Sequence, residues 1–353
     1  MKTLLITGGA GFLGSNLAIE WRKKYPHDRI FALDNLKRRG GELNLPRLKS
    51  NSIEFIHGDI RIKEDLLSLP KIDLILECSA EPSVLAGVNE SPEYLIQTNL
   101  VGTINCLELA RRDNSDFVFF STSRIYPIEY INALKFEESS TRFEWLDDQI
   151  YASASSKGIS EYFPLDKIRS LYGTTKLASE LIIQEYADLY KFRSVINRCG
   201  VLTGPWQMGK VDQGIFVYWL ASHIFKRPLK YFGYGGKGKQ VRDFLHFKDL
   251  FDLLVLQTEN WEKSNAQVFN VGGGREVSLS LCELTEICQK LTGNQVSIES
   301  IPEDRAMDIR IYLTDTSKAK KIFDWSPQYK PKETIAEIYK WIIENQSTLV
   351  HIL

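Results

Sequence analysis

The feature that most constrains the fold is a glycine-rich turn after the first apolar run. Residues 4–6 are predicted to form a strand that is buried on both faces. This strand leads into a turn that contains Gly8, Gly11, Phe12, Leu13 and Gly14. Residues 15–24 have the pattern of a helix. In such a unit the glycines allow a tight turn, close approach to a pyrophosphate and close packing of the helix. The pattern therefore predicts a dinucleotide site, against the alternative of a glycine turn that binds nothing.

A carboxylate follows at the distance that such a site needs. Residues 29–34 read as a second strand ending in Asp34, twenty residues after Gly14, with Asn35 next. A carboxylate there accepts hydrogen bonds from the ribose hydroxyls of adenosine and repels a 2′-phosphate. The basic residues at 37–39 weaken that preference. We expect NAD as the cofactor rather than NADP.

Strand-like and helix-like segments alternate as far as residue 120. This alternation predicts an α/β fold with a doubly wound, Rossmann-like parallel sheet. Ligands of such sheets lie at the carboxyl ends of the strands. Further contacts to the cofactor are therefore expected from Asp59, Ile60, Ser79 and Ala80, and from Asn99 within a helix predicted over 93–112.

The chain is expected to divide into two lobes. Residues 1–200, with 246–275 returning, would form the NAD-binding domain, and 201–353 mainly a smaller mixed α/β lobe that binds substrate. The polar stretch 137–166 is longer than ordinary loops, so we expect a lid or substrate loop there. The glycine-rich stretches 200–214 and 233–238 are typical of surface loops around a ligand.

A tyrosine and a lysine stand four residues apart in a segment predicted to be helical. Tyr172 and Lys176 would then lie on one face, where the ammonium favours the phenolate form of the phenol. Tyr172 is the only tyrosine of the chain that is followed four residues later by a lysine. The alternative interpretation of this spacing is an ordinary pair on an exposed helix surface. Thr122 follows the strand predicted over 116–120, at its carboxyl end, where a hydroxyl can donate to a substrate oxygen.

Composition excludes several classes of function. The net charge of −1 gives no electrostatic reason to bind nucleic acid or an anionic membrane. The sequence also contains no apolar run long enough to span a membrane. Five scattered cysteines and five dispersed histidines predict reduced thiols and no metal site. A strand that starts at once after Met1 leaves no room for a targeting segment, so we expect a cytoplasmic protein.

Together the three glycines, Asp34, Thr122 and the Tyr172/Lys176 pair resemble the extended short-chain dehydrogenase/reductase family of nucleotide-sugar epimerases and dehydratases. The likeness covers nearly the whole chain. Residues 34–36, 198–209 and 240–243 most resemble the branch that epimerises CDP-linked sugars at C2.

This resemblance implies a catalytic group of Thr122, Tyr172 and Lys176, with Ser123 at the sugar. It implies that Asn197, Arg242 and Arg305 hold the diphosphate of a CDP-linked substrate, and that the chain forms a homodimer or homotetramer. Tyr172 would take a hydroxyl proton as hydride leaves for the cofactor and later returns.

The same core serves other reactions. A nucleotide-sugar 4-epimerase or 4-keto reductase would use the same residues. A 4,6-dehydratase usually carries an Asp-Glu pair after the threonine, where this chain has Ser123 and Arg124. Since a fold does not determine function, a non-enzymatic NAD-binding protein is a further alternative.

Overall fold

The computed structural model describes residues 1–210 and 213–353, which form two compact units. Unit 1 comprises Met1–Ile125, Ser170–Arg198 and Phe251–Phe269, and unit 2 comprises Tyr126–Arg169, Cys199–Leu250 and Asn270–Leu353. The stretch 126–169 thus joins unit 2 rather than the first lobe, which makes the units similar in length. Part of the predicted loop 200–214, Val211 and Asp212, lies outside the described residues.

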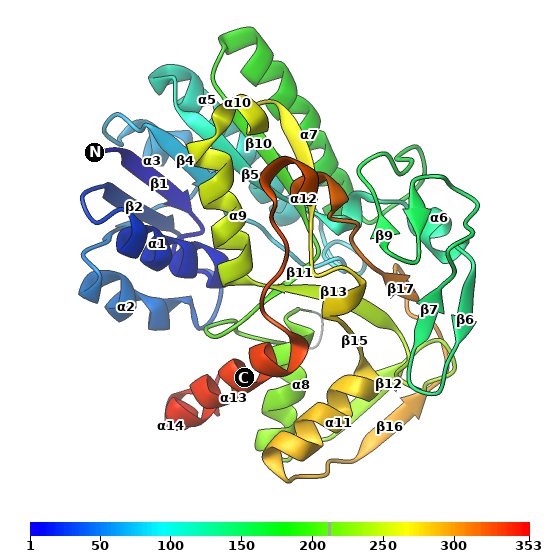
Figure 1. The fold of residues 1–353 in the computed structure, drawn as a ribbon. Coiled ribbons are helices and arrows are strands. Elements are labelled where there is room, and N and C mark those ends of the chain that lie inside the picture. Colours follow the sequence, from blue (N-terminus) through cyan, green and yellow to red (C-terminus); the bar gives the residue numbers. More distant parts are fainter. Residues whose placement is uncertain (211–212) are drawn as a thin grey trace. The chain divides into compact units, whose positions relative to one another are not determined.

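Unit 1 is built on a seven-stranded sheet with the order β14-β10-β5-β4-β1-β2-β3 (Figure 1). Its strands are β1 (Thr3–Thr7), β2 (Arg29–Asp34), β3 (Glu54–His57), β4 (Leu74–Glu77), β5 (Asp116–Thr122), β10 (Ser194–Cys199) and β14 (Gln267–Val271). The pairings from β3 through β5 are parallel. The order reverses between β1 and β4, the point at which doubly wound sheets bind their ligands. The predicted Rossmann-like α/β fold is confirmed.

Helices cover both faces of this sheet. They are α1 (Phe12–Lys24), α2 (Leu45–Ser50), α3 (Lys63–Leu67), α4 (Glu93–Ile96), the π-helical turn η2 (Gln97–Val101), α5 (Gly102–Asp113), α7 (Leu171–Tyr190), α9 (Phe247–Glu259) and α10 (Trp261–Ser264), with short 3₁₀ turns at Gly41–Asn44 and Ser123–Ile125. On one face Leu5, Ile75 and Phe117 pack with Leu109 of α5 and Ile183 of α7 in a single buried core. Alternate residues of a strand point to the same face of the sheet. The packing of these core residues therefore also determines the direction of the side chains at the strand ends.

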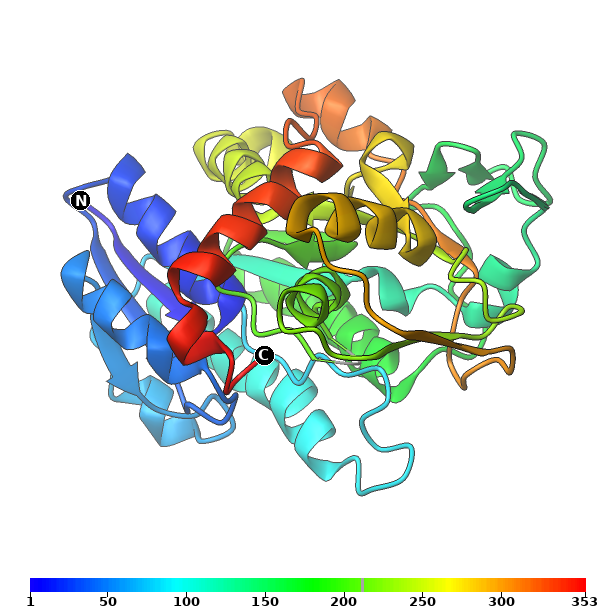
Figure 2. The ribbon, with the colours of Figure 1, turned by 90° about the horizontal axis from the view of Figure 1, so that it is seen from below.

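Unit 2 combines small sheets with a layer of helices. One sheet joins β11 (Val201–Thr203), β13 (Val241–His246), β15 (Ser278–Ser280) and β17 (Ile311–Tyr312); another pairs β12 (Leu229–Phe232) with β16 (Ile298–Ile301). The helices are α8 (Ile215–Ile224), α11 (Leu281–Thr292), α12 (Ser317–Phe323), α13 (Pro331–Glu344) and α14 (Gln346–Leu349), with a 3₁₀ turn at Arg275–Val277. Figures 1 and 2 show α8, α11 and α13 packed together.

The stretch 137–166 is not a single long loop. It holds the hairpins β6 (Phe136–Glu138)–β7 (Phe143–Trp145) and β8 (Ala154–Ser155)–β9 (Gly158–Ile159), after helix α6 (Ile128–Asn132). Phe143 and Trp145 are buried, and the Phe143 amide donates to the Lys239 carbonyl at 3.0 Å. The Arg142 guanidinium donates to Ser278 Oγ at 2.6 Å. These contacts hold the first hairpin within unit 2, and the expectation of a lid or substrate loop in this stretch stays a prediction.

Candidate active site

The glycine turn has the geometry of a phosphate cradle. Gly8 has a φ of +61°, and a Cβ on Gly14 would lie 2.2 Å from the Gly8 carbonyl oxygen, so both positions require glycine. A Cβ on Gly11 would meet only the Gly8 oxygen, at 3.1 Å, so the space beside Gly11 is otherwise open for a ligand to approach the backbone. No side chain caps α1 at Gly11, and its first turn, which begins with Phe12 and Leu13, contains no acid. The loop therefore fits the pyrophosphate of a dinucleotide.

Asp34 is tied to this loop. Its Oδ2 accepts from the Ala10 amide at 3.1 Å and its Oδ1 from the Leu36 amide at 2.8 Å. Burial raises the pKa of Asp34 against the opposing effect of these hydrogen bonds. A carboxylate has about four acceptor positions, and the amides of Ala10, Gly11 and Leu36 occupy three of them, which leaves one for a ribose hydroxyl. Lys37 is directed onto the Tyr94 ring, with Nζ 2.9 Å from the ring centroid.

Asn35 and Asp59 form one polar group at the ends of β2 and β3. Asn35 Nδ2 donates to Asp59 Oδ2 at 2.9 Å, and Arg61 Nη2 lies 2.6 Å from the same oxygen. Burial alone would raise the pKa of Asp59, but hydrogen bonds from Arg61 and Asn35 outweigh it and lower the pKa to about 2. Ile60 differs, because its side chain lies in the core and its carbonyl accepts from Asn105 at 2.8 Å. A contact from Ile60 to adenine would have to come from its backbone amide.

Ser79 and Ala80 follow β4 and are half-buried, with the Ser79 amide donating to Thr7 Oγ1 at 3.3 Å. Asn99, in the π-helical turn, is fully buried. Its side chain accepts from the Glu81 amide at 2.8 Å and donates to Thr175 Oγ1 at 3.4 Å. Asn99 therefore ties the loop after β4 to α7, a positioning contact that the sequence did not indicate.

The Tyr172/Lys176 pair lies on α7, as predicted. The helix begins at Leu171, and Ser170 caps it by accepting from the Gly173 amide at 3.1 Å. Tyr172 is 9% exposed and Lys176 only 2% exposed, so the alternative of an exposed surface pair is wrong. One helical turn separates the two residues, which places phenol and ammonium on the same side of α7.

Thr122 closes β5 and is buried with its neighbour Ser123. Thr122 Oγ1 accepts from the Arg124 amide at 3.2 Å, which leaves its proton available to a ligand oxygen. Unit 1 thus brings together the glycine loop, Asp34, Thr122 and the α7 pair, all at or beside the carboxyl ends of its strands.

The three residues expected at the diphosphate have different environments. Arg242 and Arg305 lie in unit 2. Arg242 Nη2 is 2.9 Å from Asp308 Oδ1, and the Arg305 guanidinium carbon is 3.4 Å from the Phe232 ring centroid. Asn197 is fully buried in unit 1, and its amide exchanges hydrogen bonds of 2.9 and 2.8 Å with Gln257. Both polar atoms of the Asn197 side chain are thus engaged with Gln257, and its assignment to the diphosphate stays a prediction.

Two charged residues beside the site were not among the residues predicted from the sequence. Arg61 supplies the counter-charge of Asp59, and Glu77 is a buried carboxylate at the end of β4. The signal for Glu77 is a lone acid that ends an apolar run, Leu74-Ile75-Leu76.

The described residues contain no cluster of three or more side chains able to hold a metal ion. Nor does any described helix have the length and apolar character needed to cross a bilayer.

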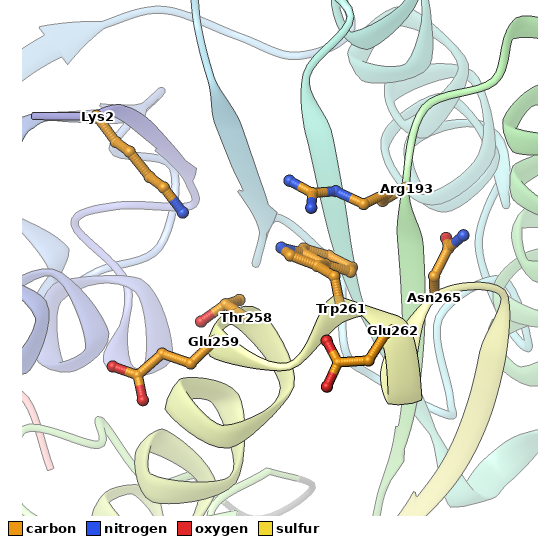
Figure 3. A pocket seen from close by; sticks show the side chains of 7 residues that line it. All are labelled: Lys2, Arg193, Thr258, Glu259, Trp261, Glu262 and Asn265. Atoms are coloured by element: carbon orange, nitrogen blue, oxygen red, sulfur yellow. The ribbon is translucent and has the colours of Figure 1, made fainter.

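A cavity of about 550 Å³ lies elsewhere on unit 1 (Figure 3). It is lined by Lys2, Arg193, Thr258, Glu259, Trp261, Glu262 and Asn265. Lys2 directly precedes β1 and Arg193 directly precedes β10, whereas the glycine loop follows β1. The cavity is thus at the amino ends of the strands and is not part of the candidate site.

Comparison with known proteins gives consistent matches. The chain is 33% identical to the CDP-paratose 2-epimerase of Salmonella typhi over 347 residues, which covers 96% of this chain and 98% of that protein. It is 28% identical to a dTDP-glucose 4,6-dehydratase of Xanthomonas campestris pv. campestris, covering 100% of this chain and 96% of that protein. A UDP-glucuronic acid 4-epimerase from Bacillus cereus, solved with UDP-glucuronic acid and NAD, has the same fold, with a TM-score of 0.78, 23% identity and coverage of 97% and 99%.

The model of the NAD dependent epimerase/dehydratase family matches residues 4–272, which include the glycine loop, Asp34, Thr122, Tyr172 and Lys176. The chain belongs to the NAD dependent epimerase/dehydratase family, and the predicted cofactor, NAD, is confirmed at that level.

Proposed function

We propose that this protein is a nucleotide-sugar epimerase that acts by transient oxidation of the sugar, with the specificity of a CDP-paratose 2-epimerase. The observation that carries the proposal is the buried Tyr172/Lys176 pair on α7, in the same unit as the glycine loop and Thr122. A buried ammonium one turn from a phenol supports its ionisation and so supplies a base.

Each of these residues has a role in the proposed reaction. Tyr172 accepts the proton of the sugar hydroxyl and returns it when the ketone is reduced. Lys176 favours the phenolate and holds the nicotinamide ribose, while Thr122 donates to the sugar oxygen as charge develops there. NAD, which the glycine loop and Asp34 would hold, would supply the acceptor for a hydride from the sugar and the donor that returns it to the opposite face. The cofactor is unchanged overall, so a catalytic amount suffices.

The choice of a CDP-linked substrate rests on the 33% identity to the Salmonella enzyme and on three stretches, 34–36, 198–209 and 240–243. Arg242 and Arg305 in unit 2 are assigned to the diphosphate. We propose unit 1 as the NAD-binding unit and unit 2 as the main substrate-binding unit of a cytoplasmic homo-oligomer.

Other reactions in the family predict different outcomes. A 4-epimerase would convert a UDP-sugar, and a 4-keto reductase would consume NADH in proportion to product. A 4,6-dehydratase would release water, and the Ser123-Arg124 sequence in place of an acidic pair disfavours it. A non-enzymatic NAD-binding protein would not require the buried Lys176.

The proposal is tested by incubating the purified chain and trace NAD with CDP-paratose, UDP-glucose and dTDP-glucose, followed by proton NMR. We expect conversion of CDP-paratose to its C2 epimer, CDP-tyvelose, without accumulation of NADH. Conversion of UDP-glucose at C4 alone, loss of water from dTDP-glucose, or stoichiometric NADH consumption would each replace the proposal with the corresponding alternative.

A further inference from the structure

A carboxylate stands on the apolar face of the central strand of unit 1. In β4, Ile75 and Glu77 share a face, and Glu77 is fully buried. The register pairs Glu77 with Thr7 of β1 on one side and with Phe119 of β5 on the other. Since Ile75 and Phe119 belong to the core that α5 and α7 cover, the Glu77 side chain faces those helices.

Lys176 reaches the same place from α7. Its Nζ lies 3.8 Å from the centroid of the Phe119 ring, which is the cross-strand neighbour of Glu77. Lysine and glutamate are almost never fully buried without an opposite charge. The charge of Lys176 lowers the pKa of Glu77 against the larger effect of burial, in keeping with their shared neighbour Phe119. The carboxylate is thus placed behind the ammonium, on the sheet side.

The remaining neighbours of Glu77 come from α5. Thr103 Oγ1 lies 3.2 Å from Glu77 Oε2 and 3.0 Å from the Asn99 carbonyl oxygen, although a hydroxyl has only one proton to donate. If Thr103 donates its proton to the Asn99 carbonyl, a protonated Glu77 can donate a hydrogen bond to Thr103 Oγ1. Glu77 Oε1 has no hydrogen-bond partner among the described residues.

Burial raises the pKa of Glu77 to about 7, against the opposing charge of Lys176. Cys106 is a further titratable group of this cluster, and burial raises the pKa of its thiol well above the usual range. Near neutral pH the Glu77 carboxyl can therefore be present in either form.

We propose that Glu77 is a positioning residue of the reaction, which holds the Lys176 ammonium from behind and sets how much of its charge acts on the Tyr172 phenol. An ionised Glu77 offsets the ammonium and weakens its effect on the phenol. A neutral group at this position leaves the ammonium uncompensated, so the phenol ionises at lower pH. The inference rests on the proposed function, because it takes Tyr172 and Lys176 as the catalytic pair.

The first test is the pH profile of kcat in the full chain with NAD. Glu77→Gln keeps the size of the side chain and removes its charge. We expect the acidic limb of the profile to move down by roughly half to one pH unit, with KM unchanged. Glu77→Asp keeps the charge and should lie nearer to wild type. Glu64→Gln makes the same charge change on the exposed surface of α3 and should leave the profile where it is. An acidic limb at the wild-type position in Glu77→Gln would overturn the proposal.

A second test needs no turnover. The ultraviolet titration of Tyr172 is obtained as the difference between each protein and its Tyr172→Phe counterpart, for wild type, Glu77→Gln and Glu77→Asp, with folding checked by circular dichroism. We expect a lower midpoint in Glu77→Gln than in wild type. An ordinary tyrosine midpoint near 10 in wild type would contradict the proposed function itself. A lowered midpoint that is identical in wild type and both Glu77 variants would contradict only the role of Glu77.

Discussion

Single carboxylates and guanidinium groups of this protein are held by specific partners before any ligand binds. Asp34 accepts from the amides of Ala10 and Leu36, and Arg242 pairs with Asp308. Such contacts fix the direction of a charged group and reduce the entropy that binding would cost. The corresponding predictions concern which ligand each group selects.

Asp34 should make NAD bind at least about tenfold more tightly than NADP, because its carboxylate accepts from the ribose hydroxyls and repels a 2′-phosphate. Fluorescence titration of each cofactor into the apo protein measures this ratio. Asp34→Asn should reduce it by weakening NAD binding. Equal affinities in wild type would mean that residues 37–39 outweigh the carboxylate.

Arg242→Ala and Arg305→Ala should each raise the KM for the nucleotide sugar by about tenfold to about a hundredfold, since a charge-assisted hydrogen bond contributes roughly 1.5–3 kcal/mol. Steady-state kinetics on the best substrate provides the comparison. Arg275→Ala is the matched control, because its exposed pair with Glu144 lies in the same unit. If both site variants kept the KM of the control, the diphosphate would bind elsewhere.

At the scale of elements, the position of α7 decides where Tyr172 and Lys176 stand. Glu180 of α7 accepts from Arg198 Nη2 of β10 at 2.8 Å and from the hydroxyl of Ser121 of β5. All three residues are buried. This network fastens the helix to two neighbouring strands.

Removal of Glu180 would leave Arg198 buried without its carboxylate. Glu180→Ala should therefore lower the free energy of unfolding by about 3–5 kcal/mol. Urea denaturation of the apo protein measures the change. Asp188→Ala removes the acid of an exposed pair at the end of the same helix, and its effect should lie within experimental error. Equal, small effects of both substitutions would contradict the account of the network.

Elements with a strong local signal could be predicted from the sequence, and elements that depend on distant partners could not. The glycine turn, the strands before and after it and the helix of Tyr172 each have a local pattern. The hairpins within 137–166 have short strands that are stabilised by residues about a hundred positions away, such as Lys239. The pairing of Asn197 with Gln257 of α9, 60 residues away, likewise has no local signal in the sequence.

At the scale of the whole molecule, the chain crosses between its two units several times, which local patterns do not reveal. Unit 2 contains its own buried carboxylate, Asp243 of β13, which accepts from the amides of Gly274 and Thr314 at 3.1 and 3.0 Å. Burial raises the pKa of Asp243 from 3.8 to about 6, although the hydrogen bonds oppose the shift.

A carboxyl with a raised pKa contributes stability that is complete below its unfolded pKa and is lost as the pH rises through the folded pKa. Between pH 4.5 and 7, wild type should therefore lose about 2 kcal/mol relative to Asp243→Asn. Urea denaturation of both proteins at the two pH values measures the difference. A difference that does not change with pH would show that Asp243 is ionised throughout.

The central claim is that Tyr172 exchanges the proton in a reaction that leaves NAD unchanged. Its most direct test is the proton NMR time course of CDP-paratose with wild type and Tyr172→Phe, each with trace NAD. We expect epimerisation at C2 by wild type without net NADH, and a rate at least about 10²-fold lower for Tyr172→Phe while NAD still binds. Epimerisation by Tyr172→Phe at a rate near that of wild type would contradict it.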